Sequence, residues 1–226
     1  MLVAVSQPTY LPWVGYLALV DKVDKFVFYD DIQYSHQSWQ QRNRIKTSGG
    51  VRWLTVPVER NFGQKISEVK ISYLNNWRAK HWDTMVQAYS DTPFFKRSAV
   101  FWEDFYRVRF FYLADMTMYL IKVMASGFNL KIPKFAKSSE FKTEGAKTDR
   151  IITLLKEVGA TEYLSSVGAR GYIEESKFRE AGIKLRWFDY KHPVYPQRGE
   201  FVPYLSSLDL LFNTGDDSVK YIRGEM

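Results

Sequence analysis

The stretch LVAVSQPTYLPWVGYLALVDKVDKFVFYDD, residues 2–31, decides the fold. It begins with a short continuous apolar run, Leu2 to Val5, which is typical of a buried strand. A polar loop follows, and residues 14–23 then carry apolar side chains at helical spacing. A second apolar run, residues 25–29, predicts another buried strand. Strand, loop, helix and strand in this order form a βαβ unit, and such units build parallel sheets.

The polar residues of this stretch fall where a parallel sheet binds its ligands, beyond the carboxyl ends of the strands. The loop of residues 6–13 and the pair Asp30–Asp31 each follow a strand, so we expect them on one edge of the sheet. The loop leads into a helix N-terminus, whose free N–H groups attract anions such as phosphates. Gly15 would permit a close approach there. A rigid structural corner is the alternative. The loop side chains expected to contact a ligand are Gln7, Tyr10 and Trp13.

Beyond residue 31 helical and strand patterns alternate, without a linker or a repeat. Residues 38–46 and 51–58 flank a Gly-Gly turn and predict a β-hairpin. The other expected elements are helices over 77–89, 93–125 (with one break), 148–158, 174–181 and 203–212, and strands over 66–71, 130–132, near 135, 162–166 and 183–188. We therefore expect one domain over residues 1–226. Its fold class is α/β: a Rossmann-like, largely parallel sheet flanked by helices, with a β-hairpin insertion and an aromatic-rich helical subregion.

The composition narrows the class of function. The 226 residues are 46% hydrophobic and 25% charged, which are ordinary globular values. Aromatic residues make up 17% of the chain, and such a surplus suits flat ligands such as sugar faces and nucleobases as well as core packing. The net charge of +7 admits nucleic acid, nucleotide phosphates, an acidic carrier protein or an anionic membrane face. The Lys and Arg residues are scattered, which argues against nucleic acid.

Several classes of site are excluded by residues that the chain lacks. There is no cysteine, so disulfides, a thiol nucleophile and thiolate metal sites are excluded. The histidines, His36, His81 and His192, are far apart in the sequence, and we expect no metal site. No Lys or Arg precedes the N-terminal apolar run and prolines interrupt it, so no targeting segment is expected. The apolar stretch 110–128 contains charged residues and predicts no membrane span. These features favour a cytoplasmic protein.

The expected hairpin combines charge with aromatic rings. Arg42 and Arg44 share one face of a strand because its side chains alternate, and Trp39 and Trp53 lie nearby in the sequence. Guanidinium groups match phosphate oxygens, so a nucleotide diphosphate would fit this face, and Asn43 adds a polar contact. Single-stranded nucleic acid would also fit it. A solvated hairpin face is the third interpretation.

Two further features carry candidate chemistry. His81 lies on the apolar face of its expected helix, which is typical of a hydrogen-bonded core histidine, yet it is the best candidate for a general base in a chain without cysteine. Asp30 and Asp31 would hold a metal, a sugar hydroxyl or a substrate amine, unless they belong to a solvated loop. No GxSxG elbow surrounds Ser165, so we expect it to bind ligand and not to act as a nucleophile. The remaining expected ligand contacts are Gln33, Tyr195 and Gln197.

Long motifs of the chain resemble the WbqC-like family. The strings that carry the resemblance are Gln7-Pro8-x-Tyr10-Leu11-Pro12-Trp13-x-Gly15-Tyr16, Asp30-Asp31-x-Gln33-Tyr34, Arg42-Asn43-Arg44-Ile45-Lys46, Trp77-x-x-x-His81-Trp82, Tyr163-Leu164-Ser165 and Tyr195-Pro196-Gln197. The resemblance spans nearly the whole chain, although Ser6 stands where other members have His. It implies a bacterial role in polysaccharide and O-antigen biosynthesis, with a glycine or other acyl transferase activity. It supplies no settled site residues.

A weaker likeness concerns the segment Trp13-Val14-Gly15-Tyr16. It occupies the place of the HxGH motif in HIGH-type nucleotidyltransferases, between a strand and a helix. Both histidines are replaced by aromatic residues here, so adenylyl transfer would lack its usual transition-state donors. The likeness therefore implies a shared ancestral fold without the chemistry.

Together these observations predict an acyl or aminoacyl transferase, glycyl transfer included, that acts on the amine of a nucleotide-linked amino sugar in surface polysaccharide biosynthesis. His81 would be the base, Asp30 would position the amine, and Arg42 and Arg44 would hold phosphate. We expect no bound cofactor; an acyl-CoA or acyl-carrier-protein thioester is the co-substrate, and a basic surface suits an acidic carrier protein. The alternatives are a nucleotide-dependent ligase or nucleotidyltransferase-like enzyme, and a non-catalytic nucleic-acid-binding protein.

Overall fold

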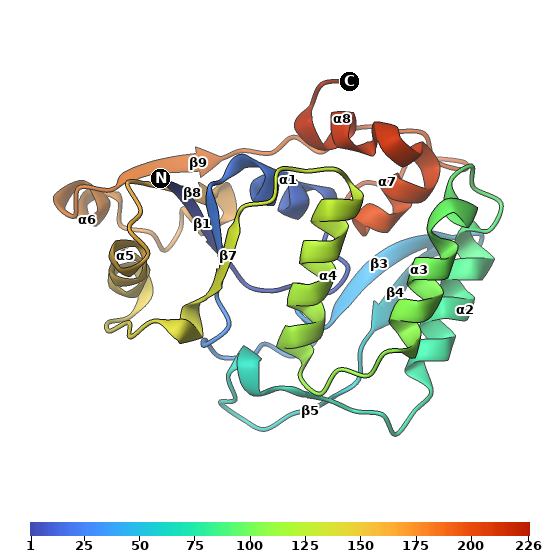
Figure 1. The fold of residues 1–226 in the computed structure, drawn as a ribbon, viewed down its shortest axis with the longest axis horizontal. Coiled ribbons are helices and arrows are strands. Elements are labelled where there is room, and N and C mark those ends of the chain that lie inside the picture. The colour runs from blue at the N-terminus through green and yellow to red at the C-terminus, as the bar shows by residue number, and fades with distance from the viewer.

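A five-stranded parallel sheet forms the centre of the protein (Figure 1), as the computed structural model of all residues 1–226 shows. The strands, in their spatial order, are β7 (Lys134–Lys137), β2 (Lys25–Phe28), β1 (Leu2–Ser6), β8 (Glu162–Ser166) and β9 (Lys184–Phe188). Every neighbouring pair runs parallel. The predicted Rossmann-like α/β fold is confirmed.

Helices cover both faces of the sheet. They are α1 (Val14–Lys22) and α4 (Leu113–Gly127) on one face, and α5 (Lys147–Glu157) and α6 (Glu175–Glu180) on the other. Because side chains alternate along a strand, Ala4 and Phe26 join the larger core with α1 and α4. Val3 and Val27 point the other way and pack with α5 and α6. Figure 1 shows α5 and α6 on the side of the molecule away from α4.

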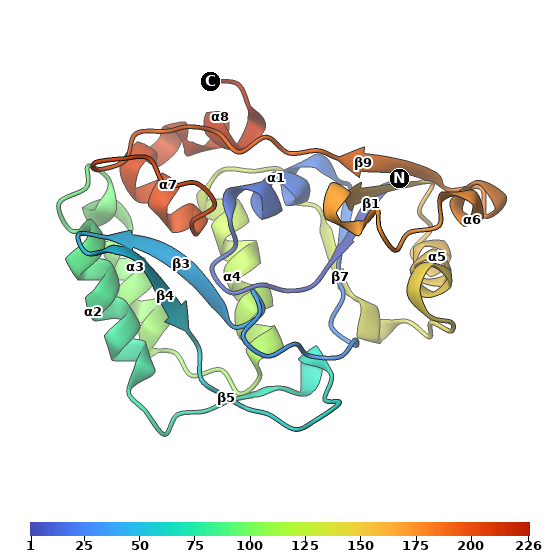
Figure 2. The same cartoon turned by 180° about the vertical axis from the view of Figure 1, so that it is seen from behind.

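The insertion between β2 and β7 contains the predicted hairpin and the aromatic helices. Strands β3 (Arg42–Thr47) and β4 (Gly50–Thr55) pair antiparallel, and α2 (Trp77–Tyr89) packs on β3. Figure 2 shows α2 and α3 (Phe95–Arg107) beside this hairpin. Near the C-terminus, α7 (Ser207–Thr214) and α8 (Ser218–Arg223) complete the larger core. Aromatic rings from α2 and α3 fill much of it.

Three predicted elements differ from the structure. Residues 66–71 form a 3₁₀ turn (Ile66–Glu68) and a short strand, β6 (Lys70–Ile71), that pairs with β5 (Val58–Glu59). Ile66 and Val69 are both buried, and their spacing of three suits a helical turn. No strand forms over residues 130–132, where Leu130 is buried in the core. The last long helix begins at residue 207 and not at 203, because the Ser206 hydroxyl caps it by accepting from the Leu208 N–H.

The order of the strands defines where the sheet opens. From β1 the chain turns to β2 and then β7 on one side, whereas β8 and β9 add to the other side. The loops after β1 and β8 therefore diverge, and ligands of open α/β sheets bind in the crevice between such loops.

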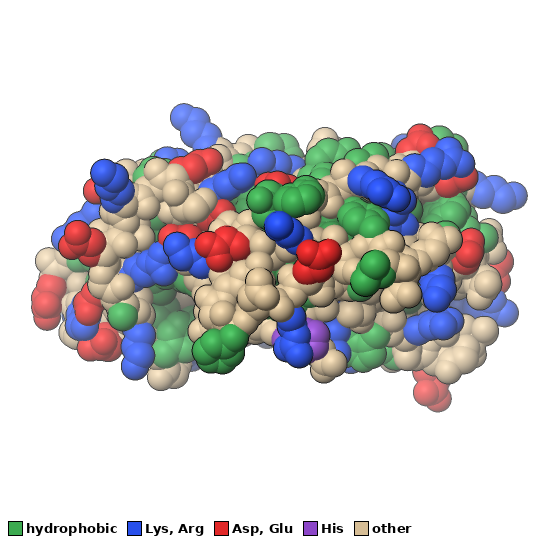
Figure 3. Space-filling model, turned by 90° about the horizontal axis from the view of Figure 1, so that it is seen from below, with side chains coloured by type: hydrophobic (Ala, Val, Ile, Leu, Met, Phe, Trp, Pro, Cys, Tyr) green, Lys and Arg blue, Asp and Glu red, His purple; other side chains and the backbone are tan.

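Surface charge is mixed over the face seen from below, where Lys and Arg alternate with Asp and Glu (Figure 3). This agrees with the scattered charge of the sequence. No helix has the length and apolar character needed to cross a bilayer.

Candidate active site

A cleft of about 690 Å³ lies beyond the carboxyl ends of β1 and β8. Ser6 and Gln7 reach it from β1, and Ser165 and Ser166 reach it from β8. Its aromatic lining consists of Trp13, Tyr16, Tyr29, Trp39, Tyr163, Tyr172, Phe188 and Tyr190. A volume of this order is typical of small-molecule sites. The cleft therefore lies at the predicted edge of the sheet, at the topological switch point between β1 and β8.

A second pocket, of about 410 Å³, adjoins this cleft. The residues that line both are Thr9, Trp13, Tyr16 and Trp39. The second pocket adds Asn43, Arg44 and Tyr204. Since the two share walls, they form one continuous surface that runs from the sheet edge to the hairpin.

The hairpin end of this surface carries two arginines held by tryptophan rings. The Arg42 guanidinium carbon lies 4.3 Å from the centroid of the Trp53 ring. The Arg44 carbon lies 5.7 Å from Trp39 and 5.8 Å from Trp53. Arg44 donates one bond of 3.0 Å to the Tyr204 carbonyl oxygen. The Nε–H groups of Arg42 and Arg44 are buried and have no partner.

The sheet end of the surface carries uncharged polar groups. The Gln40 side-chain amide donates to Gln7 Oε1 over 2.8 Å, which leaves the Gln7 amide nitrogen free. The hydroxyls of Thr9 and Tyr190 are buried without a partner, and Ser165, near the end of β8, is buried as well. These groups can both donate and accept hydrogen bonds, as sugar hydroxyls require.

Trp13 lies across the first turn of α1. A Cβ atom added to Gly15 would lie 2.1 Å from the Trp13 ring. The ring also stacks on His192, with centroids 6.2 Å apart, and meets Tyr190 edge-on. Gly15 lines the cleft, as the expected close approach requires, but the indole of Trp13 fills the space where a Cβ of this residue would lie.

The substitution Gly15→Ala is expected to destabilise the protein by about 1–3 kcal/mol, because the rigid indole has to leave its place. The helix propensity of alanine acts in the opposite direction and is worth only about 1 kcal/mol. Thermal unfolding, followed by tryptophan fluorescence, measures the result. Gly127→Ala is the matched control, since a Cβ at this helical glycine meets nothing within 4 Å. Equal melting temperatures for the two variants would contradict the prediction.

His81 is 7% exposed and does not line the cleft. Its Nδ1 lies 2.9 Å from the Tyr10 hydroxyl, which lies 2.7 Å from the Tyr106 hydroxyl. Burial lowers the pKa of His81 to about 4, although a hydrogen bond with the Thr55 backbone acts the other way. His81 and Tyr10, predicted to act on substrate, are thus core residues here, and the base assigned to His81 has no geometric support.

The carboxylate of Asp30 is also occupied by hydrogen bonds within the protein. It is 1% exposed, and its carboxylate accepts from the Ser138 hydroxyl (3.1 Å) and from the backbone N–H and hydroxyl of Ser139 (3.0 and 2.8 Å). Asp31 binds Ser138 and pairs with Arg150. These bonds tie the end of β2 to the segment after β7. The neighbours Tyr29 and Ile32 line the cleft, whereas the two carboxylates do not.

Of the remaining residues predicted to contact a ligand, Asn43 lines a pocket and the others do not. Asn43 is buried and donates to the Leu11 carbonyl oxygen over 2.6 Å, so it positions the Gln7–Trp13 loop and also lines the second pocket. Gln33 is exposed beside Lys65 and lines neither pocket. Tyr195 is buried away from the cleft. The side-chain oxygen of Gln197 accepts hydrogen bonds from the Lys46 ammonium and from the Val202 N–H, which links the C-terminal loop to β3.

The structure therefore brings together five of the predicted residues, which are Gln7, Trp13, Asn43, Arg44 and Ser165. Arg42 lies beside them over Trp53. Sequence reasoning missed Thr9, Tyr190 and Tyr204. Thr9 lay inside the quoted loop and its hydroxyl was a usable signal. Tyr190 follows β9, and only the strand order places it near β8.

The chain matches known proteins over almost its full length. The model of the WbqC-like protein family covers residues 7–221. The chain is 38% identical over 226 residues to "Uncharacterized protein Rv1507c" of Mycobacterium tuberculosis (strain ATCC 25618 / H37Rv), an alignment that covers 98% of this chain and 97% of that protein. No solved structure matches.

Proposed function

This chain belongs to the WbqC-like protein family, and from that premise we propose that it transfers an acyl or aminoacyl group to the amine of a nucleotide-linked amino sugar. The reaction would serve bacterial surface polysaccharide biosynthesis, such as that of O-antigen. The family match covers every residue that lines the cleft except Val5 and Ser6. The donor is an acyl-CoA or acyl-carrier-protein thioester.

One observation carries the proposal: the aromatic surface at the switch point ends at Arg44, with Arg42 beside it over Trp53, and both have unpaired buried Nε–H groups. An unpaired buried donor costs about 1–3 kcal/mol, and phosphate oxygens on Arg42 and Arg44 would remove that cost. A base stacked on Trp39 or Trp13 would lie next to them. A nucleotide diphosphate meets both requirements.

The sheet end of the cleft would then receive the sugar. Gln7, Thr9 and Ser165 offer hydrogen bonds to its hydroxyls and amide. Tyr190 contributes both an apolar ring and an unpaired hydroxyl. In this arrangement several neutral polar contacts would fix the position of the sugar. The phosphates of the nucleotide would lie at the hairpin.

The transfer itself requires little acid–base chemistry from the protein. Neither pocket wall contains Asp, Glu or His. The amine nitrogen attacks the thioester carbonyl carbon, the C–N bond forms, the C–S bond breaks, and the departing sulfur takes the amine proton to become a thiol. Correct positioning of amine and thioester can supply much of such a rate enhancement. The free hydroxyl of Thr9 is a donor for the oxyanion that develops at the carbonyl.

A thermal-shift panel at fixed salt tests the proposal. A nucleotide-linked amino sugar is expected to raise the melting temperature more than its parent nucleotide, because it fills both ends of the cleft. The panel includes an acyl-CoA, ATP with magnesium, and a short oligonucleotide. A shift with ATP–magnesium alone would contradict the proposal in favour of a ligase. A shift with the oligonucleotide alone would favour a nucleic-acid-binding protein.

Arg44→Gln is expected to weaken binding of a nucleoside diphosphate by about 30-fold, or about 2 kcal/mol, since a charge-assisted contact to phosphate is lost. Binding of the nucleoside without phosphates should hardly change. Titration calorimetry measures both affinities. Arg52→Gln is the control, because Arg52 is exposed on β4 of the same hairpin and lines neither pocket. Equal losses in the two variants would show that only overall charge matters.

A further inference from the structure

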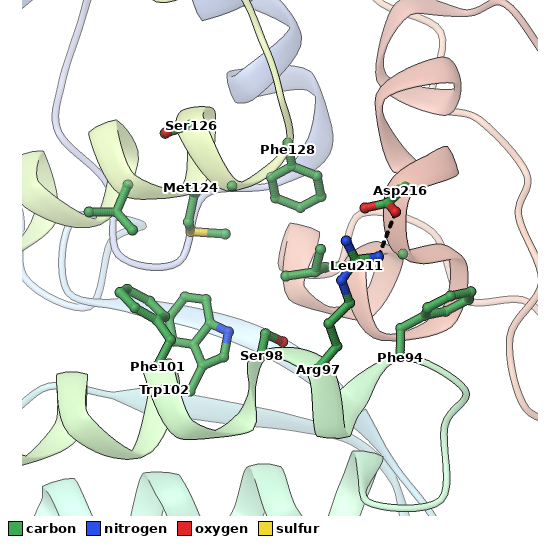
Figure 4. Close-up of a pocket in the computed structure, with 13 residues that line it drawn as sticks. Phe94, Arg97, Ser98, Phe101, Trp102, Met124, Ser126, Phe128, Leu211 and Asp216 are labelled. Carbon is green, nitrogen blue, oxygen red and sulfur yellow. Dashed lines mark hydrogen bonds and ion pairs between the residues drawn. The ribbon is translucent and has the colours of Figure 1, made fainter.

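A separate cavity lies between α3, α4 and the end of α7, away from the cleft (Figure 4). Its volume is about 410 Å³, and it shares no lining residue with the cleft or its adjoining pocket. Its apolar walls consist of Phe94, Phe101, Trp102, Val123, Met124, Phe128 and Leu211. The size falls within the usual range of ligand sites, about 300–1,000 Å³.

Two polar groups inside these apolar walls have no partner. Trp102 is only 2% exposed, and its indole N–H makes no hydrogen bond. The hydroxyl of Ser98, one helical turn earlier on α3, is buried and unpaired as well. Figure 4 shows the indole nitrogen on the edge of Trp102 that faces Ser98. Buried donors without partners are uncommon in proteins, so a pair of them in one cavity indicates a missing acceptor.

An ion pair between an arginine and an aspartate lies beside these donors. Arg97 precedes Ser98 on α3 and pairs with Asp216 across the cavity, and both side chains are largely exposed. An anionic group next to Ser98 would therefore approach a guanidinium that remains accessible to solvent. The ion pair lies at one end of the cavity, and Phe101 and Met124 lie at the other (Figure 4).

We propose that this cavity binds a medium-chain aliphatic carboxylate, with its chain along Phe101 and Met124 and its carboxylate on Trp102 Nε1 and Ser98 Oγ beside Arg97. A carboxylate accepts hydrogen bonds and donates none, so it satisfies both unpaired donors at once. The apolar walls take up the chain. A cationic or purely apolar head group would leave the donors unpaired.

Titration calorimetry with decanoate, below its micellar concentration, tests this assignment. Decanoate is expected to bind saturably at one site and to raise the melting temperature. Decylamine has the same chain length and a protonated amine as its head group. It is expected to bind at least about tenfold more weakly, because it cannot accept hydrogen bonds from the two buried donors. Equal affinities for the two compounds would overturn the proposal.

Variants of the donors locate the site. Trp102→Phe keeps a ring and removes the N–H, and Ser98→Ala removes the hydroxyl; each is expected to weaken decanoate binding about three- to tenfold. Ser98→Thr keeps a hydroxyl and should bind as the wild type does, which provides a matched control even if Trp102→Phe folds poorly. Equal affinities for wild type, Ser98→Ala and Ser98→Thr would overturn the assignment. The shift caused by a nucleotide-linked amino sugar should be unchanged in Ser98→Ala, so the two sites are tested separately.

Discussion

Asp30→Ala is expected to lower the free energy of unfolding by about 3 kcal/mol. The carboxylate accepts from Ser138 and Ser139, which lie more than 100 residues away in the sequence, and it is 1% exposed. Removing it breaks the hydrogen bonds from the fully buried Ser138 hydroxyl and from the N–H and hydroxyl of Ser139, and a hydrogen bond to a charged group is worth about 1.5–3 kcal/mol. Urea unfolding followed by circular dichroism measures the loss.

Two variants control for this substitution. Asp30→Asn keeps one acceptor oxygen and is expected to lose less than half as much stability. Asp189→Ala removes an exposed carboxylate that also follows a strand of the sheet, β9, and is expected to change stability by less than about 0.5 kcal/mol. An Asp30→Ala protein with wild-type stability and no sugar binding would instead show that Asp30 contacts the substrate amine.

His81 is expected to make the protein about 3 kcal/mol less stable at pH 4 than at pH 6.5. Its pKa is about 4 in the folded protein against an ordinary value of 6.5. Above pH 6.5 both states hold a neutral imidazole, and the contribution is complete. As the pH falls towards 4, the unfolded chain binds a proton that the folded protein rejects, so stability is lost. Below pH 4 both states are protonated and no further loss arises from this group.

Unfolding curves at pH 7 and pH 4.5 measure the effect. His81→Gln has no titrating group at this position, so its stability should fall less between the two pH values than that of the wild type. His36→Gln is the control, because it makes the same change of side chain at an exposed position. A His81→Gln protein with the full wild-type loss would place the acid-sensitive group elsewhere. Such a result would reopen the role of His81 as a base.

The sequence predicted those elements whose pattern is local. The helix Trp77–Tyr89 and the strand Glu162–Ser166 have the predicted bounds, because an amphipathic period or a short apolar run is visible within a dozen residues. Arg42 and Arg44 were placed on one face of the hairpin correctly for the same reason, since side chains on a strand follow a period of two and both guanidinium groups lie over Trp53. A site beyond the carboxyl end of β1 followed from the βαβ order, whereas its position between β1 and β8 depends on the strand order of the sheet.

Predictions that depended on distant partners were the ones that differed. The local sequence around Asp30 does not show whether its carboxylate binds a ligand or accepts hydrogen bonds from Ser139. His81 meets Tyr10 across 71 positions, and no local pattern reports that contact. The Trp13 ring over Gly15 is a matter of one side-chain rotamer. The cavity of Trp102 arises from three helices, and its residues had been interpreted only as an aromatic-rich region.

The sheet joins the two ends of the chain, and this has a consequence for biosynthesis. Strand β1 is central, and its pairing of Leu2 with Glu162 spans 160 positions. On the ribosome β1 and β2 emerge early, but one edge of β1 has no partner until β8 has been made. Contacts so distant in sequence slow folding, and an unpaired apolar strand attracts other chains in the meantime. Nascent chains that end before residue 162 therefore expose the unpaired edge of the apolar strand β1 to chaperones or to aggregation.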